Sequence, residues 1–75
     1  MKSDVTLDTK GMLCPVPIVK TNVKVKELKQ GQVIEVISTD LGIKEDMPRW
    51  CKSTGNEFLG IEEEGGIYKA YVRKK

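Results

Sequence analysis

The alternation of apolar and polar residues predicts four strands. Val5 to Lys10 has a period of two, which is typical of a short strand. Gln32 to Thr39 carries apolar residues on both faces, so we expect it to be central in a sheet. Two further strands are predicted over Glu57 to Glu63 and Ile67 to Arg73, and the glycine turn Glu64-Gly65-Gly66 between them suits a hairpin.

A first helix is predicted from Pro15 to about Leu28. Proline suits the first helical position, because its φ is already helical and its missing N–H has no partner there, so we expect Cys14 at the N-cap. Gly31 is expected near the C-cap. One side of this helix gathers the core-facing residues, namely Ile18, Thr21, Val25 and Leu28. The run Val23-Lys24-Val25-Lys26 alternates like a strand and opposes the helix near its end.

A second helix is predicted after Asp40, which is a candidate N-cap, and it should end at Gly55. Pro48 removes one backbone hydrogen bond, so this helix either kinks or restarts with Asp46 as its cap. Its apolar stripe has helical spacing and consists of Ile43, Met47, Trp50, Cys51 and Thr54.

The element order is therefore βαβαββ. Right-handed crossovers and an antiparallel final pair predict a two-layer α/β (α+β) sandwich, with a mixed four-stranded sheet and two helices on one face. We expect residues 1–75 to form a single domain, because the composition does not shift along the chain. A domain of this size has a thin core, so its chemistry should take place at the surface.

The composition excludes several classes of function. A net charge of +2 does not imply nucleic-acid binding by itself. Histidine is absent, which excludes Cys-His catalysis and leaves too few ligands for a zinc site, so we expect no metal and no cofactor. The two cysteines fit neither a disulfide scaffold nor a Cys-x-x-Cys motif. Without a signal peptide or an apolar span, the cytoplasm is the expected location.

Cys14 is the candidate nucleophile, in the run Cys14-Pro15-Val16-Pro17. A thiol at a helix N-terminus meets unpaired N–H groups and the positive end of the helix dipole, which lower its pKa from about 8.5. Pro15 and Pro17 would stiffen this platform. The alternative is a buried structural cysteine, the commonest environment of a free thiol, but packing alone does not explain the flanking prolines.

The stretch Leu7 to Pro17 resembles the signature of the TusA/SirA small sulfur-carrier proteins, which include YeeD-like members. The resemblance continues to Gly55 through Leu28, Gly31, Asp40, Asp46-Met47-Pro48 and Trp50-Cys51. It implies the same sandwich fold and a persulfide carried on Cys14. It also implies a sulfur donor, such as a cysteine desulfurase, a rhodanese-like protein or thiosulfate, and a sulfur-acceptor protein. YeeD-like members further imply a membrane transporter of the YeeE type.

Two positions depart from the tRNA-thiolation members of this family, which leaves the donor open. Val16 replaces a polar residue between the prolines, and Asn22 replaces a basic residue. The rival function is an RNA-binding or regulatory module, because βαβαββ also resembles the C-terminal domain of a bacterial translation initiation factor. That rival rests on fold analogy alone, and we expect no direct nucleic-acid contact.

Other residues have candidate roles around Cys14. Gly11 would give the backbone room, and Met12 could contact a partner. On the first helix, Val16, Val19 and Val23 form a second apolar stripe that a helix on one sheet face cannot fully bury, so it is a candidate docking surface with Lys20 on its rim. Cys51 lies on the core stripe of the second helix, so we expect it to be buried and not a redox partner of Cys14.

Overall fold

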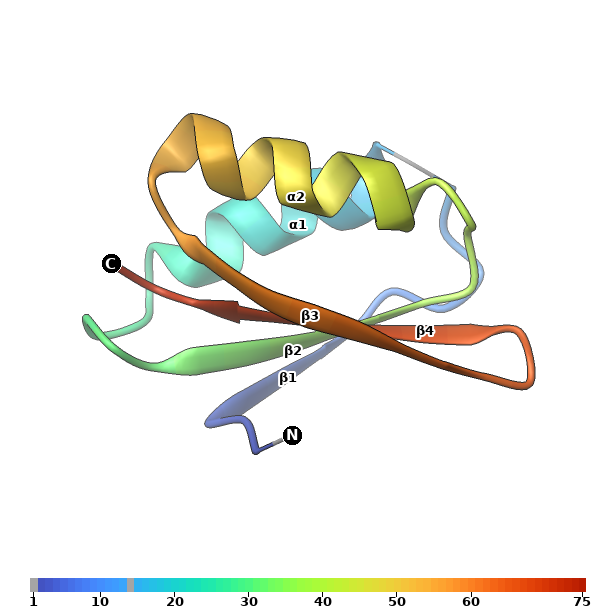
Figure 1. Ribbon diagram of the computed structural model, residues 1–75, viewed down its shortest axis with the longest axis horizontal. Coiled ribbons are helices and arrows are strands. Elements are labelled where there is room, and N and C mark those ends of the chain that lie inside the picture. Colours follow the sequence, from blue (N-terminus) through green and yellow to red (C-terminus); the bar gives the residue numbers. More distant parts are fainter. Residues whose placement is uncertain (1, 14) are drawn as a thin grey trace.

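The computed structural model describes residues 2–13 and 15–75. Its elements follow the expected order: β1 (Val5–Asp8), α1 (Val16–Val25), β2 (Val33–Ser38), α2 (Ile43–Thr54), β3 (Glu57–Glu64) and β4 (Ile67–Arg73). The strands form one mixed sheet in the order β1-β2-β4-β3, in which β1 and β2 are parallel and the other pairs are antiparallel. Figure 1 shows both helices above the same face of this sheet, which confirms the two-layer sandwich. No helix in the described ranges is long and apolar enough to cross a membrane.

The core lies between the helices and the inner face of the two central strands. Ile34 and Val36 of β2 are paired with Val72 and Ala70 of β4, and all four are fully buried. The helices close this layer with Val25, Ile43, Met47 and Cys51. The central position predicted for β2 is confirmed, because β2 pairs with β1 on one side and with β4 on the other. Alternate residues along it are buried, so the helices cover one of its faces.

The first helix is shorter than the sequence predicts at both ends. It begins at Val16 with Pro15 as its N-cap, so the expectation that Pro15 is the first helical residue is wrong by one position. It ends at Val25 with Lys26 as C-cap, and Leu28 closes a tighter turn by donating to the Val25 carbonyl oxygen at 3.0 Å. The β-branched residues before Lys26 explain this early end. Gly31 lies beyond the helix, at a φ of 89°.

The second helix is continuous through Pro48, which excludes a restart at Asp46. Gly42 is its N-cap, so the N-cap predicted at Asp40 is wrong by two residues. The Asp40 carboxylate instead accepts a hydrogen bond from the Gly42 N–H at 3.2 Å, an Asx turn leading into the helix. Thr54 is exposed and not part of the core stripe, because its hydroxyl bonds back to the Trp50 carbonyl oxygen at 2.9 Å.

The last two strands form the predicted hairpin. Glu64 pairs with Ile67, so the turn consists of Gly65 and Gly66 alone. Both glycines have positive φ, 57° and 80°, as a type I′ turn requires. β4 has the predicted bounds, and β1 and β3 begin where predicted. β3 ends one residue later than predicted, β2 is one residue shorter at each end, and β1 ends at Asp8 and not at Lys10.

Candidate functional site

The loop between β1 and α1 contains the predicted nucleophile. β1 and β2 are parallel, so this loop and the β2–α2 loop leave the sheet at the same end (Figure 1). In α/β folds the carboxyl ends of parallel strands are where ligands and reactive groups gather. Cys14 itself lies outside the described residues, so its acidity remains a prediction, but the N-cap expected at Cys14 is wrong by one position, because Pro15 is the N-cap of α1. The residues that hold and flank it are described on both sides.

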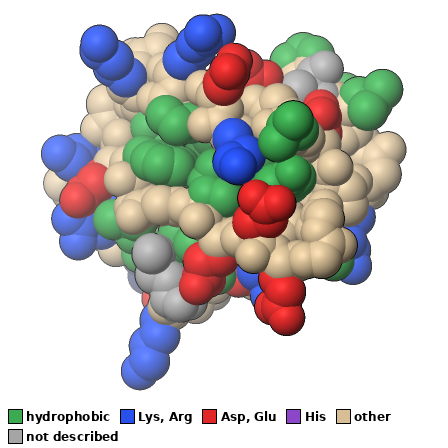
Figure 2. Space-filling view, turned by 45° about the vertical axis from the view of Figure 1, so that its right-hand side comes forward, with side chains coloured by type: hydrophobic (Ala, Val, Ile, Leu, Met, Phe, Trp, Pro, Cys, Tyr) green, Lys and Arg blue, Asp and Glu red, His purple; other side chains and the backbone are tan. Residues whose placement is uncertain are grey.

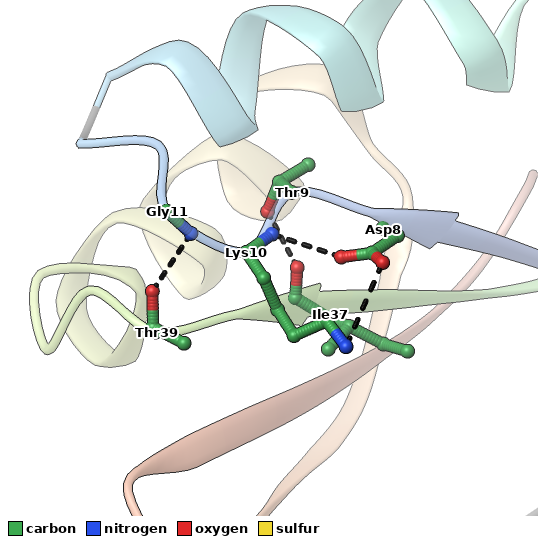
Figure 3. A network of polar contacts seen from close by, with 6 residues as sticks. All are labelled: Asp8, Thr9, Lys10, Gly11, Ile37 and Thr39. Carbon is green, nitrogen blue, oxygen red and sulfur yellow. Dashed lines mark hydrogen bonds and ion pairs between the residues drawn. The ribbon is translucent and has the colours of Figure 1, made fainter.

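Hydrogen bonds tie the first part of this loop to β2 and the segment after it, as Figure 3 shows. The backbone N–H and the hydroxyl of Thr9 both donate to the Ile37 carbonyl oxygen, at 2.7 and 2.5 Å, and Thr9 is fully buried. The Gly11 N–H donates to the Thr39 hydroxyl at 3.0 Å. The two loops are therefore joined directly, three residues before Cys14.

Gly11 has a backbone conformation that favours glycine, with a φ of 81°. A Cβ placed there would meet no described residue within 4 Å. Whether Gly11 also gives room on the approach to Cys14 stays a prediction, because Cys14 lies outside the described residues. The turn it allows continues as Met12 donates its N–H to the Thr9 carbonyl oxygen at 3.1 Å.

The first turn of α1 offers fewer N–H groups than an ordinary helix start. Pro15 and Pro17 have none, and the Val16 N–H already donates to the Leu13 carbonyl oxygen at 3.0 Å. An anion near this end would thus be stabilised chiefly by the helix dipole, which is worth about 0.3–1 kcal/mol at an exposed site. Pro17 is buried and anchors the first turn of the helix, whereas Pro15 is exposed.

The residues on both sides of Cys14 in the sequence are exposed. Leu13 is 74% exposed and Val16 is 43% exposed, while Met12 is half-buried. Leu41, in the adjoining β2–α2 loop, is 63% exposed. Figure 2 turns this end of the molecule forward and shows hydrophobic side chains at the surface among charged ones. Sequence reasoning missed Leu13 and Leu41 as candidate contact residues, although leucines in glycine- and proline-bounded loops have little to pack against.

The second apolar stripe of α1 is exposed, as the sequence predicts. Val19 and Val23 are 57% and 58% exposed, and Lys20 between them is also at the surface. A shallow pocket beside them is completed by Leu7 of β1. The stripe therefore extends from the start of α1 along its outer side. Its use as a docking surface stays a prediction.

Cys51 has the environment of a structural cysteine. It is 2% exposed in the core layer, and burial raises the pKa of its thiol to about 11. The prediction that Cys51 is a core residue is confirmed. Next to it, the Trp50 indole N–H donates to the Asn22 side-chain oxygen at 3.4 Å, which joins the two helices. Asn22, which departs from the basic residue of some relatives, thus has a structural contact.

No metal site is formed by the described residues: within 2–13 and 15–75, histidine, cysteine, aspartate and glutamate side chains do not gather in groups of three. The arrangement is a small two-layer sandwich that presents a loop with a cysteine motif beside an exposed apolar helix face. Such an arrangement is sufficient for sulfur transfer through a single thiol, because attack on a sulfur–sulfur bond requires only a thiolate that the other molecule can reach.

Comparisons with known proteins identify the family. The family model described as Sulfurtransferase TusA matches residues 5–74, so the chain belongs to the TusA family. It is 43% identical over 72 residues to the sulfur carrier protein TusA of Pseudomonas entomophila, covering 96% of this chain and 90% of that protein. It is 47% identical over 74 residues to YrkI of Bacillus subtilis, covering 99% of each.

Two further comparisons concern length and fold. YrkF of Bacillus subtilis is 50% identical over 74 residues, and the match covers 99% of this chain but only 40% of YrkF. The crystal structure of a SirA-like protein from Desulfitobacterium hafniense superposes with a TM-score of 0.81, covering 92% of this chain and 95% of that one. At 20% identity that likeness shows the shared fold alone.

Proposed function

We propose that this chain is a sulfur carrier that holds a sulfane sulfur as a persulfide on Cys14 and passes it to an acceptor protein. The observation that carries the proposal is the contrast between its two cysteines. Cys51 is buried with a raised thiol pKa, while Cys14 stands in the family motif between exposed neighbours in the sequence. Membership of the TusA family and the name of its Pseudomonas relative support the same role.

The transfer balances without a redox partner. The Cys14 thiolate attacks the outer sulfur of a donor persulfide, R–S–SH, forming Cys14–S–SH and releasing the donor thiolate R–S⁻. With thiosulfate, the thiolate takes the outer sulfur and sulfite leaves. An acceptor thiolate then attacks the outer sulfur of Cys14–S–SH, which regenerates the Cys14 thiolate. The sulfur donors in this scheme are a cysteine desulfurase, a rhodanese-like protein or thiosulfate. A YeeE-type transporter would supply the thiosulfate.

The exposed face of α1 is the proposed docking surface for these proteins. It consists of Val16, Val19 and Val23, with Lys20 on the rim and the half-buried Met12 in the preceding loop. Exposed apolar side chains beside a reactive group mark a site of protein contact. Lys20 would affect the association rate more than the affinity, because rim charges act chiefly by steering.

Intact-protein mass spectrometry tests the function. After incubation with thiosulfate or a persulfide donor, we expect one added sulfur atom that a reducing agent removes. Cys14→Ser should abolish the adduct, and Cys51→Ser should retain it because the Cys51 thiol is buried. An adduct that survives Cys14→Ser contradicts the proposal. RNA binding that stays tight at physiological salt, in a chain that takes up no sulfur, would favour the rival binding module.

A further inference from the structure

β1 is an edge strand with one side unpaired. In the order β1-β2-β4-β3 it pairs with β2 alone, and Figure 1 shows it at the lower edge of the sheet. The backbone N–H and C=O groups on the outer side of such a strand have no partner strand among the described residues. Exposed edges of this kind accept an additional strand from another chain.

The opposite edge of the sheet is protected against such pairing by a bulge and by charges, whereas β1 is limited only by its short length. β3 has a bulge between Phe58 and Gly60, and it ends in the exposed carboxylates Glu62, Glu63 and Glu64. Bulges and charges of this kind are how natural sheets block added strands. In β1 the one charged residue is Asp8, and its carboxylate lies 3.8 Å from the Lys10 ammonium nitrogen. The free edge of β1 is thus short but unblocked.

A groove for side chains runs beside this edge. α1 packs against β2 and α2, which leaves the inner face of β1 partly uncovered and its Leu7 half-buried. The shallow pocket between the two elements has an apolar floor of Leu7, Val19 and Val23. A strand added to β1 would lie about 4.8 Å from it, and alternate side chains of that strand would point into this groove.

The rim of the groove carries a cation that is available to a ligand. The Lys24 ammonium nitrogen lies 4.0 Å from the carboxylate of Glu27, in the turn after α1, and is paired with it. Lys20, one turn nearer the start of α1, forms no ion pair with any described carboxylate. A ligand with a carboxylate at one flank therefore complements this rim better than a basic one.

We propose that the groove between β1 and α1 binds an extended peptide segment of a sulfur-exchanging partner, with alternating apolar residues and an acidic flank, which pairs with β1 as a fifth strand. This inference rests on the proposed function for the identity of the partner. The groove begins at Val19, one turn beyond the N-cap of α1, so a bound segment would bring the partner's body toward Cys14. Four residues of β1 span about 13 Å, which a segment of four to six residues matches.

Peptide selection on the Cys14→Ser chain tests this, because that variant removes sulfur chemistry while the groove stays unchanged. Random ten-residue peptides are selected by display, and the strongest binders are measured by fluorescence anisotropy. We expect alternating apolar residues with Asp or Glu at one end. In hydrogen exchange, these peptides should slow exchange of the amides of Val5–Asp8.

Three variants locate the binding. Lys20→Glu and Val23→Lys should each weaken binding about fivefold or more, which corresponds to about 1 kcal/mol. Lys52→Glu, an equal charge reversal at an exposed position on α2, is the matched control and should leave the affinity unchanged. Methylating alternate amides of the peptide should abolish binding, because strand pairing needs those donors.

The proposal is overturned if no peptide is selected, if the affinities ignore both groove variants, or if exchange slows only outside β1. Thermal melting of Val23→Lys separates lost binding from lost folding, and Lys20→Glu supplies an independent exposed variant. The sulfur adduct of the wild-type chain is measured separately. A chain that takes up sulfur but selects no peptide would refute the groove alone, and the reverse result would refute the carrier role alone.

Discussion

At the residue scale, the two cysteines differ by their surroundings and not by their chemistry. Cys51 falls on a helical apolar stripe, and that spacing alone predicts the burial that the structure confirms. Cys14 is singled out by its prolines and by family resemblance. The sequence could not predict that the Val16 N–H, which lies between those prolines, already donates to the Leu13 carbonyl oxygen, because this depends on where the helix begins.

The acidity of Cys14 gives one prediction. With few N–H groups nearby, the helix dipole should lower the thiol pKa from about 8.5 by less than one unit, since it contributes at most about 1 kcal/mol. The measurement is the pH dependence of alkylation in a Cys51→Ala background, which leaves one thiol. A midpoint at or above about 8.5 would remove support for a helix-stabilised thiolate.

Cys51 gives a prediction for alkaline stability. Its folded-state pKa is raised to about 11, so the unfolded chain loses this proton at lower pH than the folded chain does. The contribution of the protonated Cys51 thiol to the stability of the fold is complete below about pH 9 and is lost as the pH rises toward 11. Between these limits the free energy of unfolding should fall by about 2–3 kcal/mol more in the wild type than in Cys51→Ala. Urea unfolding at several pH values measures this, and parallel pH profiles would contradict it.

At the element scale, α1 has both a core face and an exposed apolar face. Helical periodicity predicted both, because the two stripes differ only by a rotation about the helix axis. Its boundaries were predicted less well. The prolines at its start and Gly31 after its end limit where the helix can lie, but the helix ends at the β-branched Val25, well before Gly31. For α2, the predicted apolar stripe is confirmed except at Thr54, which is exposed. The N-cap predicted at Asp40 is wrong, because Gly42 is the N-cap and the Asp40 carboxylate accepts a hydrogen bond from the Gly42 N–H.

The exposed stripe predicts a separation of stability from transfer. Val19→Lys and Val23→Lys, made singly, should shift the melting temperature little, because each side chain is more than half exposed. Transfer of sulfur between this chain and a partner protein should become several-fold slower. Thermal melting and the rate of persulfide transfer are the two measurements, with Lys52→Glu as the control. Lost stability would place these valines in the core, and unchanged transfer would exclude the docking surface.

At the scale of the whole molecule, the sheet has one face under the helices and one face without them. Strand count and the mixed sheet were predictable from periodicity and crossover rules. Contacts across the uncovered face were not predictable from the sequence. They depend on the pairing of β4 with β2, two strands that are far apart in the sequence. This order places Tyr71 opposite Glu35 and near Glu62, and Tyr71 is 2% exposed although no helix covers it.

Tyr71 holds the uncovered face together through its hydroxyl, which donates to the Glu35 carboxylate at 2.7 Å. Burial raises the pKa of Tyr71, and the hydrogen bonds to Glu62 and Glu35 raise it further. The same bond with Tyr71 is the main cause of the lowered pKa of Glu62. Since the folded-state pKa of Glu62 is lowered, this contribution is present above its unfolded value of about 4.3 and is lost as the pH falls through the folded value.

Tyr71→Phe should therefore destabilise the fold by about 1.5–3 kcal/mol at pH 7, the usual range for a hydrogen bond to a charged group. The difference from wild type should narrow in acid, where protonation of Glu62 weakens the bond. Urea unfolding at neutral and acidic pH measures both effects. Tyr68→Phe is the matched control, because Tyr68 is also buried but faces the helices, with the Lys44 ammonium 5.7 Å from its ring centroid. Both variants keep the aromatic ring, so an equal loss in the two would contradict a special role of the Tyr71 hydroxyl, and a loss that does not change with pH would contradict the role of Glu62.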